Sequence, residues 1–194
     1  MVKKVHKKSG GHILARSPGP SYQELLDKEV NPVPDSLRDN TNPYLGSENL
    51  SVDRYLSREF HDKEVEHVWQ RTWQAVCRET EVGEPGDTHV YDITRFSIIV
   101  TRTTAGKLKA FQNACLHRGR QLVDKNGNYE KFRCPYHAFT WSLEGDFKWA
   151  PCKWDFPHIK EDEFGLPEVQ VDIWGGWVFI NMDLDAPSLQ DYLG

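Results

Sequence analysis

Two short stretches, each pairing one cysteine with one histidine, constrain this 194-residue chain more than any other feature of its sequence. The first reads Cys-Leu-His-Arg-Gly at residues 115–119, and the second reads Cys-Pro-Tyr-His at residues 134–137. Side chains this close in sequence converge on one centre only where the backbone turns sharply, and Gly119 and Pro135 favour such turns. The repeated pairing therefore predicts two loops that together present two thiolates and two imidazoles.

Two kinds of metal centre use two cysteines and two histidines. One is a structural zinc site, but zinc sites of this composition usually pair Cys with Cys and His with His. The other is a [2Fe–2S] cluster in which two cysteines bind one iron and two histidines bind the other, so that loops carrying one ligand of each kind suit it. The order of the ligands therefore favours the cluster, with single-electron transfer as its task. The candidate ligands are Cys115, His117, Cys134 and His137.

The other cysteines bear on the compartment of the protein. Four cysteines would allow two disulfides, but two of the four lie in Cys/His pairs, which in an intracellular protein indicates metal binding. We expect Cys77 and Cys152 to be buried thiols. The N-terminal lysines precede no apolar segment, and no stretch approaches the roughly 18 apolar residues that span a bilayer. We therefore expect a cytoplasmic protein with no membrane partner.

The charge balance gives no reason to expect a nucleic-acid partner. The formal net charge is −5, so the chain has no overall positive field that would attract phosphates. One basic run lies near the N-terminus, and we interpret it as a solvated terminal segment rather than as a nucleic-acid arm. The run consists of Lys3, Lys4, Lys7 and Lys8.

The sequence divides into three stretches of different character. Residues 1–50 are rich in Pro, Gly, Asn and Ser and predict an extended N-terminal arm, with one short helix over 22–29 that ends before Pro32. Residues 51–80 form a helical lead-in, where apolar side chains at three- and four-residue spacing predict one amphipathic helix over 62–73. Residues 81–194 contain the cysteine and histidine pairs and form the third stretch.

Short β-prone runs between turns dominate this third stretch and predict a mainly β domain of antiparallel sheets. Glycine-containing turns at 104–106 and 144–146 predict hairpins. The expected strands cover residues 88–93, 96–103, 108–113, 131–133, 139–142, 169–173 and 177–181.

The motifs resemble the N-terminal region of the Rieske non-haem iron oxygenase α subunits, the aromatic-ring-hydroxylating oxygenases. The resemblance is carried by residues 115–119 and by Cys-Pro-Tyr-His-Ala-Phe-Thr-Trp-Ser-Leu-Glu-Gly at 134–145, and it extends to 69–73, 83–87 and 175–181. It implies a Rieske [2Fe–2S] fold over residues 81–194. It also implies that Cys115 and Cys134 bind one iron while His117 and His137 bind the other. Tyr136 is either a contact to the cluster sulfurs or a packing aromatic.

The chain also departs from related proteins. Respiratory Rieske proteins join their two cluster loops by a disulfide, but Arg120 and Tyr136 stand at the corresponding positions here. The oxygenase family more often has Gly-Trp where this chain has Ala138 and Phe139. The family's Asp/Asn-x-x-His-x₃₋₄-His motif for mononuclear iron is not matched, since five residues separate His61 from His67. We therefore assign no catalytic residue in this chain.

The resemblance implies the Rieske electron-transfer portion of an oxygenase α subunit, part of a dioxygenase or monooxygenase. A ferredoxin or reductase would donate electrons, and the acceptor would be a mononuclear Fe(II) site in a catalytic domain outside this chain or in a neighbouring subunit of a homo-oligomer. The isolated chain is expected only to transfer electrons. The alternative is a stand-alone, ferredoxin-like Rieske carrier. The N-terminal arm and the helix before the motifs favour the oxygenase, because small Rieske ferredoxins resemble only the β domain.

Overall fold

The computed structural model describes residues 19–38 and 48–194. The chain divides into two compact units, Met1–Ser51 and Val52–Gly194, which we describe separately. The basic run at residues 3–8, together with the rest of 1–18 and with 39–47, lies outside the described residues.

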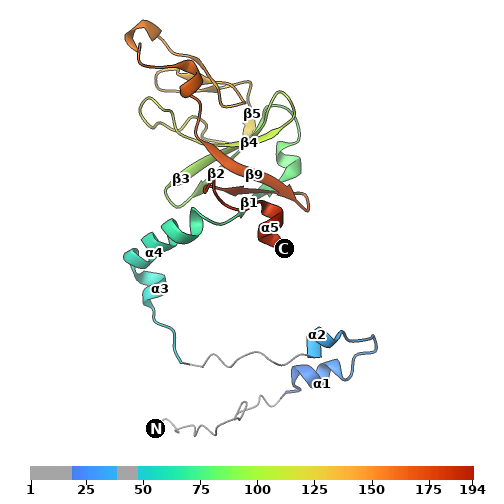
Figure 1. Cartoon of the computed structure of the whole chain (residues 1–194). Helices are drawn as coiled ribbons and strands as arrows, with labels where there is room; N and C mark the ends of the chain where they lie inside the picture. The colour runs from blue at the N-terminus through green and yellow to red at the C-terminus, as the bar shows by residue number, and fades with distance from the viewer. Residues whose placement is uncertain (1–18, 39–47) are drawn as a thin grey trace. The chain divides into compact units, whose positions relative to one another are not determined.

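The described part of the first unit contains two short helices, α1 (Tyr22–Leu26) and α2 (Asp35–Arg38) (Figure 1). A capping box begins α1: Glu24 N–H donates to the Ser21 hydroxyl at 3.3 Å, and Ser21 N–H donates to the Glu24 carboxylate at 2.7 Å. The expected helix over 22–29 is thus shorter than predicted. It ends at Leu26 because Lys28 and Glu29 form tighter i→i+3 bonds instead of continuing the α pattern.

The second unit is built on one curled, seven-stranded sheet in the order β1–β10–β9–β4–β3–β2–β5 (Figure 1). Every pairing in it is antiparallel, so the prediction of a mainly β, antiparallel fold is confirmed. The strands are β1 (Gln74–Arg78), β2 (Asp87–Ile93), β3 (Phe96–Arg102), β4 (Leu108–Gln112), β5 (Gly127–Asn128), β9 (Glu168–Trp174) and β10 (Trp177–Asn181).

A second, three-stranded antiparallel sheet carries the second motif. It consists of β6 (Phe132–Arg133), β7 (Thr140–Trp141) and β8 (Phe147–Trp149) in that order. The register pairs Phe132 with Trp141 and Arg133 with Thr140. Residues 134–139 therefore form the connection of a hairpin, which keeps both ends of the second motif close together.

The helix before the sheet differs from the one expected over 62–73. It follows the single turn α3 (Asp53–Leu56) and begins as α4 (Arg58–Glu64), where the Ser57 hydroxyl accepts Phe60 N–H at 3.2 Å. It continues as a π-helical turn, η1 (Val65–Trp69), and ends there. Trp73 lies outside the helix, buried, with its indole N–H donating to the Pro187 carbonyl at 2.9 Å. The hydrogen bond from Trp73 to Pro187 therefore outweighs the three- and four-residue spacing that predicted a helix up to Trp73.

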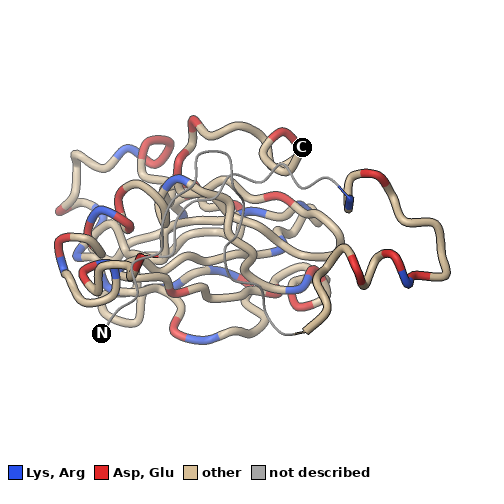
Figure 2. Tube along the Cα trace, turned by 90° about the horizontal axis from the view of Figure 1, so that it is seen from below, with Lys and Arg blue, Asp and Glu red and all other residues tan. Residues whose placement is uncertain are grey.

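Short helical turns complete the second unit. They are η2 (Glu79–Val82), η3 (Lys153–Asp155), η4 (Glu161–Glu163) and α5 (Leu189–Leu193). None of the described helices is long and apolar enough to cross a membrane. Figure 2 shows Lys and Arg interspersed with Asp and Glu along the described trace, as the small net charge implies.

Two hydrophobic clusters lie inside the second unit. One joins residues of the seven-stranded sheet, such as Ile98 and Ile180, with Val82 of η2. The other includes Phe139 and Trp141 of the second motif's hairpin and both motif cysteines. The two motif loops therefore rest on an aromatic core, which limits how far they can move.

Gly145, in the turn between β7 and β8, offers a test of this packing. Its φ is +89°, and a Cβ there would lie 2.7 Å from Cζ of the buried Phe111 ring. Gly106, in the turn between β3 and β4, has φ +74° but no atom within 4 Å of such a Cβ. We expect Gly145→Ala to lower the free energy of unfolding by about 3 kcal/mol, from backbone strain plus overpacking. We expect Gly106→Ala to cost about 1 kcal/mol, from strain alone.

Urea unfolding of both variants measures the difference. Equal losses of unfolding free energy in the two variants would mean that the core next to Gly145 rearranges to make room for the added methyl group.

Candidate metal centre

The two motif loops fold in the same way. Cys115 N–H donates to the Arg120 carbonyl at 2.8 Å, and Gly119 N–H donates to the Cys115 carbonyl at 2.8 Å. In the second loop, Cys134 N–H donates to the Phe139 carbonyl at 2.8 Å, and Ala138 N–H donates to the Cys134 carbonyl at 2.9 Å. Each loop thus closes around its cysteine with bonds at the same sequence offsets.

The fourth residue after each cysteine takes a left-handed backbone conformation. Gly119 has φ +70° and Ala138 has φ +62°. The turn expected at Gly119 is therefore present, and its counterpart in the second loop is Ala138 rather than Pro135. A non-glycine residue in this region costs roughly 1 kcal/mol, which the surrounding loop must offset. The Gly-to-Ala departure noted in the sequence falls at this strained position.

The loops bring the two cysteines together and the two histidines together. Cys115 and Cys134 are buried in the same core cluster, close enough for Cys134 to raise the pKa of the Cys115 thiol. The His117 and His137 rings lie edge to face with centroids 4.9 Å apart. The two loops thus contribute a cysteine pair and a histidine pair.

Backbone groups surround the Cys115 sulfur. Burial raises the pKa of the Cys115 thiol, while the peptide N–H groups of His117 and Arg118 act in the opposite direction. Cys134 raises the same pKa further. Peptide donors of this kind stabilise a metal-bound thiolate, because they point hydrogen-bonding N–H groups at its charge.

The His117 ring is neutral and held by aromatic neighbours. Burial, followed by the charges of His137 and Arg118, lowers the pKa of His117. Its ring stacks on Phe139 at 4.6 Å with an interplanar angle of 13°, and it meets Phe156 edge to face at 5.9 Å. A neutral, fixed imidazole is the form that binds a metal.

Two observations test whether the donor set fits a two-iron cluster. Among the described residues, His137 Nδ1 is the single buried side-chain nitrogen or oxygen without a hydrogen-bond partner, so this atom requires a ligand. No three donor atoms of the two motifs lie within 4.8 Å of one another; in the described chain only a different group meets that distance. One zinc ion would draw its donors to about 3.3–3.8 Å from each other. The motif donors therefore do not form a compact single-ion group among the described residues.

Asn113 supports the first loop, although nothing in the sequence pattern singled it out. Its buried amide oxygen accepts the N–H groups of Leu122 and Val123 at 3.0 Å each. Its amide nitrogen donates to the Val123 carbonyl at 2.6 Å and to the Ser97 hydroxyl at 3.0 Å. One side chain thereby ties the end of the loop to its beginning.

The remaining sequence expectations have mixed outcomes. Cys77 is buried as predicted, but Cys152 is exposed, because it precedes η3 at the surface with φ +48°. The Tyr136 ring is 60% exposed and lies 3.7 Å from the His137 ring. Its contact to cluster sulfurs stays a prediction. His61, outside the motifs, is half exposed and lies 3.7 Å from Glu64.

Comparison with known proteins shows which proteins this chain is similar to. Residues 72–160, which include all four predicted ligands, match the family model of the Rieske [2Fe–2S] domain. The α subunit of biphenyl 2,3-dioxygenase from Rhodococcus jostii (strain RHA1) is 29% identical over 142 residues, which cover 72% of this chain and 31% of the relative. The carnitine monooxygenase oxygenase subunit of Escherichia coli (strain K12) is 32% identical over 140 residues, which cover 72% of this chain and 37% of the relative.

Solved structures agree with these relatives. A quaternary ammonium Rieske monooxygenase in complex with an inhibitor superposes with a TM-score of 0.69 at 29% identity, over 73% of this chain and 39% of the other. Naphthalene 1,2-dioxygenase bound to phenanthrene superposes with a TM-score of 0.68 at 30% identity, over 72% and 32%. The chain thus spans between 31% and 39% of the length of these relatives.

Proposed function

Because this chain carries a Rieske [2Fe–2S] domain that matches the N-terminal part of Rieske oxygenase α subunits, we propose that it is the electron-transfer portion of such an oxygenase. In this proposal Cys115 and Cys134 bind one iron, and His117 and His137 bind the other. The observation that carries the proposal is the pairing of thiol with thiol and of imidazole with imidazole by two loops of the same fold. Such a cluster supplies one-electron transfer when bound.

The residues around the ligands have definable tasks. The peptide N–H groups of His117 and Arg118 offset negative charge on the Cys115 sulfur, which favours the reduced state. Phe139 and Phe156 pack against the His117 ring and limit access of water to that side of the cluster. His117 and His137 are only partly buried, so electrons can enter or leave at the histidine side.

We propose a ferredoxin or reductase as the electron donor and a mononuclear Fe(II) site of an oxygenase as the acceptor. A quaternary ammonium Rieske monooxygenase similar to this chain is described in terms of inter-subunit electron transfer. By analogy, the acceptor lies in a catalytic domain or a neighbouring subunit of a homo-oligomer. A ferredoxin-like carrier is less well supported, because the similarity to oxygenase subunits covers about 140 residues, beyond the 72–160 domain.

Metal and sulfide analysis of the purified protein tests the proposed cofactor. We expect two irons and two acid-labile sulfides per chain and, after reduction, the EPR signal of a cluster with mixed cysteine and histidine ligation. Protein that contains no iron and holds one zinc ion through Cys134 would contradict the proposal.

A further inference from the structure

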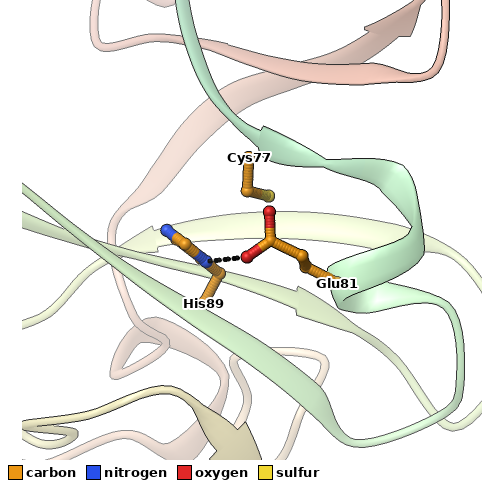
Figure 3. A group of neighbouring side chains, drawn as sticks. All are labelled: Cys77, Glu81 and His89. Carbon is orange, nitrogen blue, oxygen red and sulfur yellow. Dashed lines mark ion pairs between the residues drawn. The ribbon is translucent and has the colours of Figure 1, made fainter.

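A second group of metal-binding side chains lies outside the two motifs. It joins Cys77 of β1, Glu81 of η2 and His89 of β2 (Figure 3). One donor atom from each residue lies within 4.8 Å of the other two, which no other group of three or more Cys, His, Asp or Glu side chains achieves in residues 19–38 and 48–194. Figure 3 shows the carboxylate between the sulfur and the imidazole.

We propose that Cys77 Sγ, the Glu81 carboxylate and His89 Nδ1 form a second metal site, separate from the iron–sulfur centre, that takes a Zn²⁺ ion. Zinc accepts sulfur, nitrogen and oxygen donors together, and sites with three protein ligands leave the fourth position to water. The Glu81 side chain is 48% exposed, so water can reach this position from the carboxylate side. The site adds a metal centre to the electron-transfer function proposed above and does not depend on it.

The hydrogen bonds of Asn126 leave His89 Nδ1 without a proton. The Asn126 amide oxygen accepts Val90 N–H at 2.8 Å, which turns the amide nitrogen toward His89 Nδ1 at 3.0 Å. An amide N–H₂ group only donates, so Nδ1 carries no proton and its one lone pair accepts the Asn126 N–H; zinc bound at Nδ1 would replace this hydrogen bond. The Glu81 carboxylate nevertheless lies 3.5 Å from the same nitrogen. With no proton on Nδ1, no hydrogen bond links it to the carboxylate, and a cation could bind to both groups.

The charges of the group also fit a divalent cation. Burial, followed by the negative charge of Glu81, raises the pKa of the Cys77 thiol to about 12. Zn²⁺ binding replaces the thiol proton, which passes to solvent, and the thiolate and carboxylate together then neutralise the ion. Two neighbouring arginines have other partners: Arg78 of β1 lies over the Trp177 ring at 4.0 Å, and Arg102 of β3 lies 3.9 Å from Glu79.

The arrangement of the group excludes a nucleophilic role for Cys77. Its residue is only 2% exposed and its thiol is protonated, whereas reactive cysteines are accessible thiolates. Arg78 N–H donates a hydrogen bond to the Glu81 carboxylate at 2.9 Å and so helps to position it. To bind zinc, the donors must approach to about 3.3–3.8 Å from one another. The half-exposed Glu81 side chain can make that adjustment if its hydrogen bond with Arg78 N–H lengthens or breaks.

Zinc uptake by the protein with its iron–sulfur cluster in place tests the proposal. The wild-type protein and the variants are incubated with zinc chloride, desalted, and analysed for zinc, iron and sulfide in the same samples. We expect one zinc per wild-type chain and at least tenfold weaker binding by Glu81→Gln and by His89→Gln, with iron and sulfide unchanged. His61→Gln is the matched control, because it removes another histidine paired with a glutamate and should bind zinc as the wild type does.

Zinc-edge X-ray absorption identifies the ligands. We expect one sulfur among nitrogen and oxygen donors in the wild type, and none in Cys77→Ser. Equal zinc binding by wild type, Glu81→Gln and His89→Gln would overturn the proposal. Two sulfur ligands accompanied by loss of iron would also overturn it, because zinc would then have entered at Cys115 and Cys134. If Cys77→Ser fails to fold, the Glu81 and His89 variants still decide the question, since both side chains reach the surface.

Discussion

Replacing Cys134 by Ser or His137 by Ala is expected to yield protein without iron and with a less stable β domain. The two loops fold around the proposed cluster, so the free energy of metal binding is also folding free energy. The aromatic core that contains Phe139 and Trp141 also contains Cys115 and Cys134, so loss of the cluster leaves two buried thiols without partners next to it. We expect a loss of stability on the order of several kcal/mol. Iron analysis and thermal unfolding followed by circular dichroism measure both effects.

Cys152→Ser is the matched control for the cysteine variant. Cys152 is exposed and lies outside the two loops, so its replacement should leave two irons per chain and an unchanged unfolding temperature. Retention of both irons by Cys134→Ser and His137→Ala would show that these residues are not ligands.

Asn113→Ala is expected to be the most damaging substitution outside the proposed ligands. It leaves the buried N–H groups of Leu122 and Val123 without acceptors, and each such group costs about 1–3 kcal/mol. We therefore expect a loss of about 3 kcal/mol or more in the free energy of unfolding. Because Asn113 ties both ends of the first loop together, the variant should also release iron to a chelator faster than the wild type. Urea unfolding and the rate of iron loss to the chelator measure the two effects.

Asn128→Ala serves as the comparison. Asn128 is exposed and donates to the Pro85 carbonyl and to the Asp87 carboxylate, so its replacement should cost less than about 1 kcal/mol and leave iron release unchanged. If the two asparagine variants released iron at the same rate, the structural role assigned to Asn113 would be wrong.

Strand prediction succeeded for every strand of five or more residues except β1. The expected strand over 177–181 has the bounds of β10, and those over 88–93 and 108–113 differ from β2 and β4 by one residue. It failed for β1, whose pairing with β10 is interrupted by an irregularity between Ala75 and Cys77. It also failed for the short strands β5 and β8, whereas the similarly short β6 and β7 fall within the expected strands over 131–133 and 139–142.

The helix over 62–73 shows the limit of periodicity. Val65 is buried as the spacing requires, but Val68 is 43% exposed and the helix ends at Trp69. Trp73 continues the spacing and yet lies after the helix, directly before β1, where it is buried and its indole N–H donates to the Pro187 carbonyl. A hydrogen bond to a residue more than a hundred positions away decides the end of this helix, and no local pattern reports it.

The sequence by itself determined the β class and predicted the two loops and the four ligands, because all of these depend on residues close together in the chain. Two Cys/His pairs of alternating order predict a mixed-ligand centre, and this prediction does not depend on where the fold places the loops. Only the tertiary structure decided which side chains meet across the sheet. In the sheet, β1 is the edge strand next to β10, whereas β2 lies near the other end. The sheet is curled and η2 contacts both β1 and β2, so Cys77, Glu81 and His89 come together. Asn113 is likewise placed by contacts with Leu122 and Val123 that form only once the first loop has folded back on its own strand.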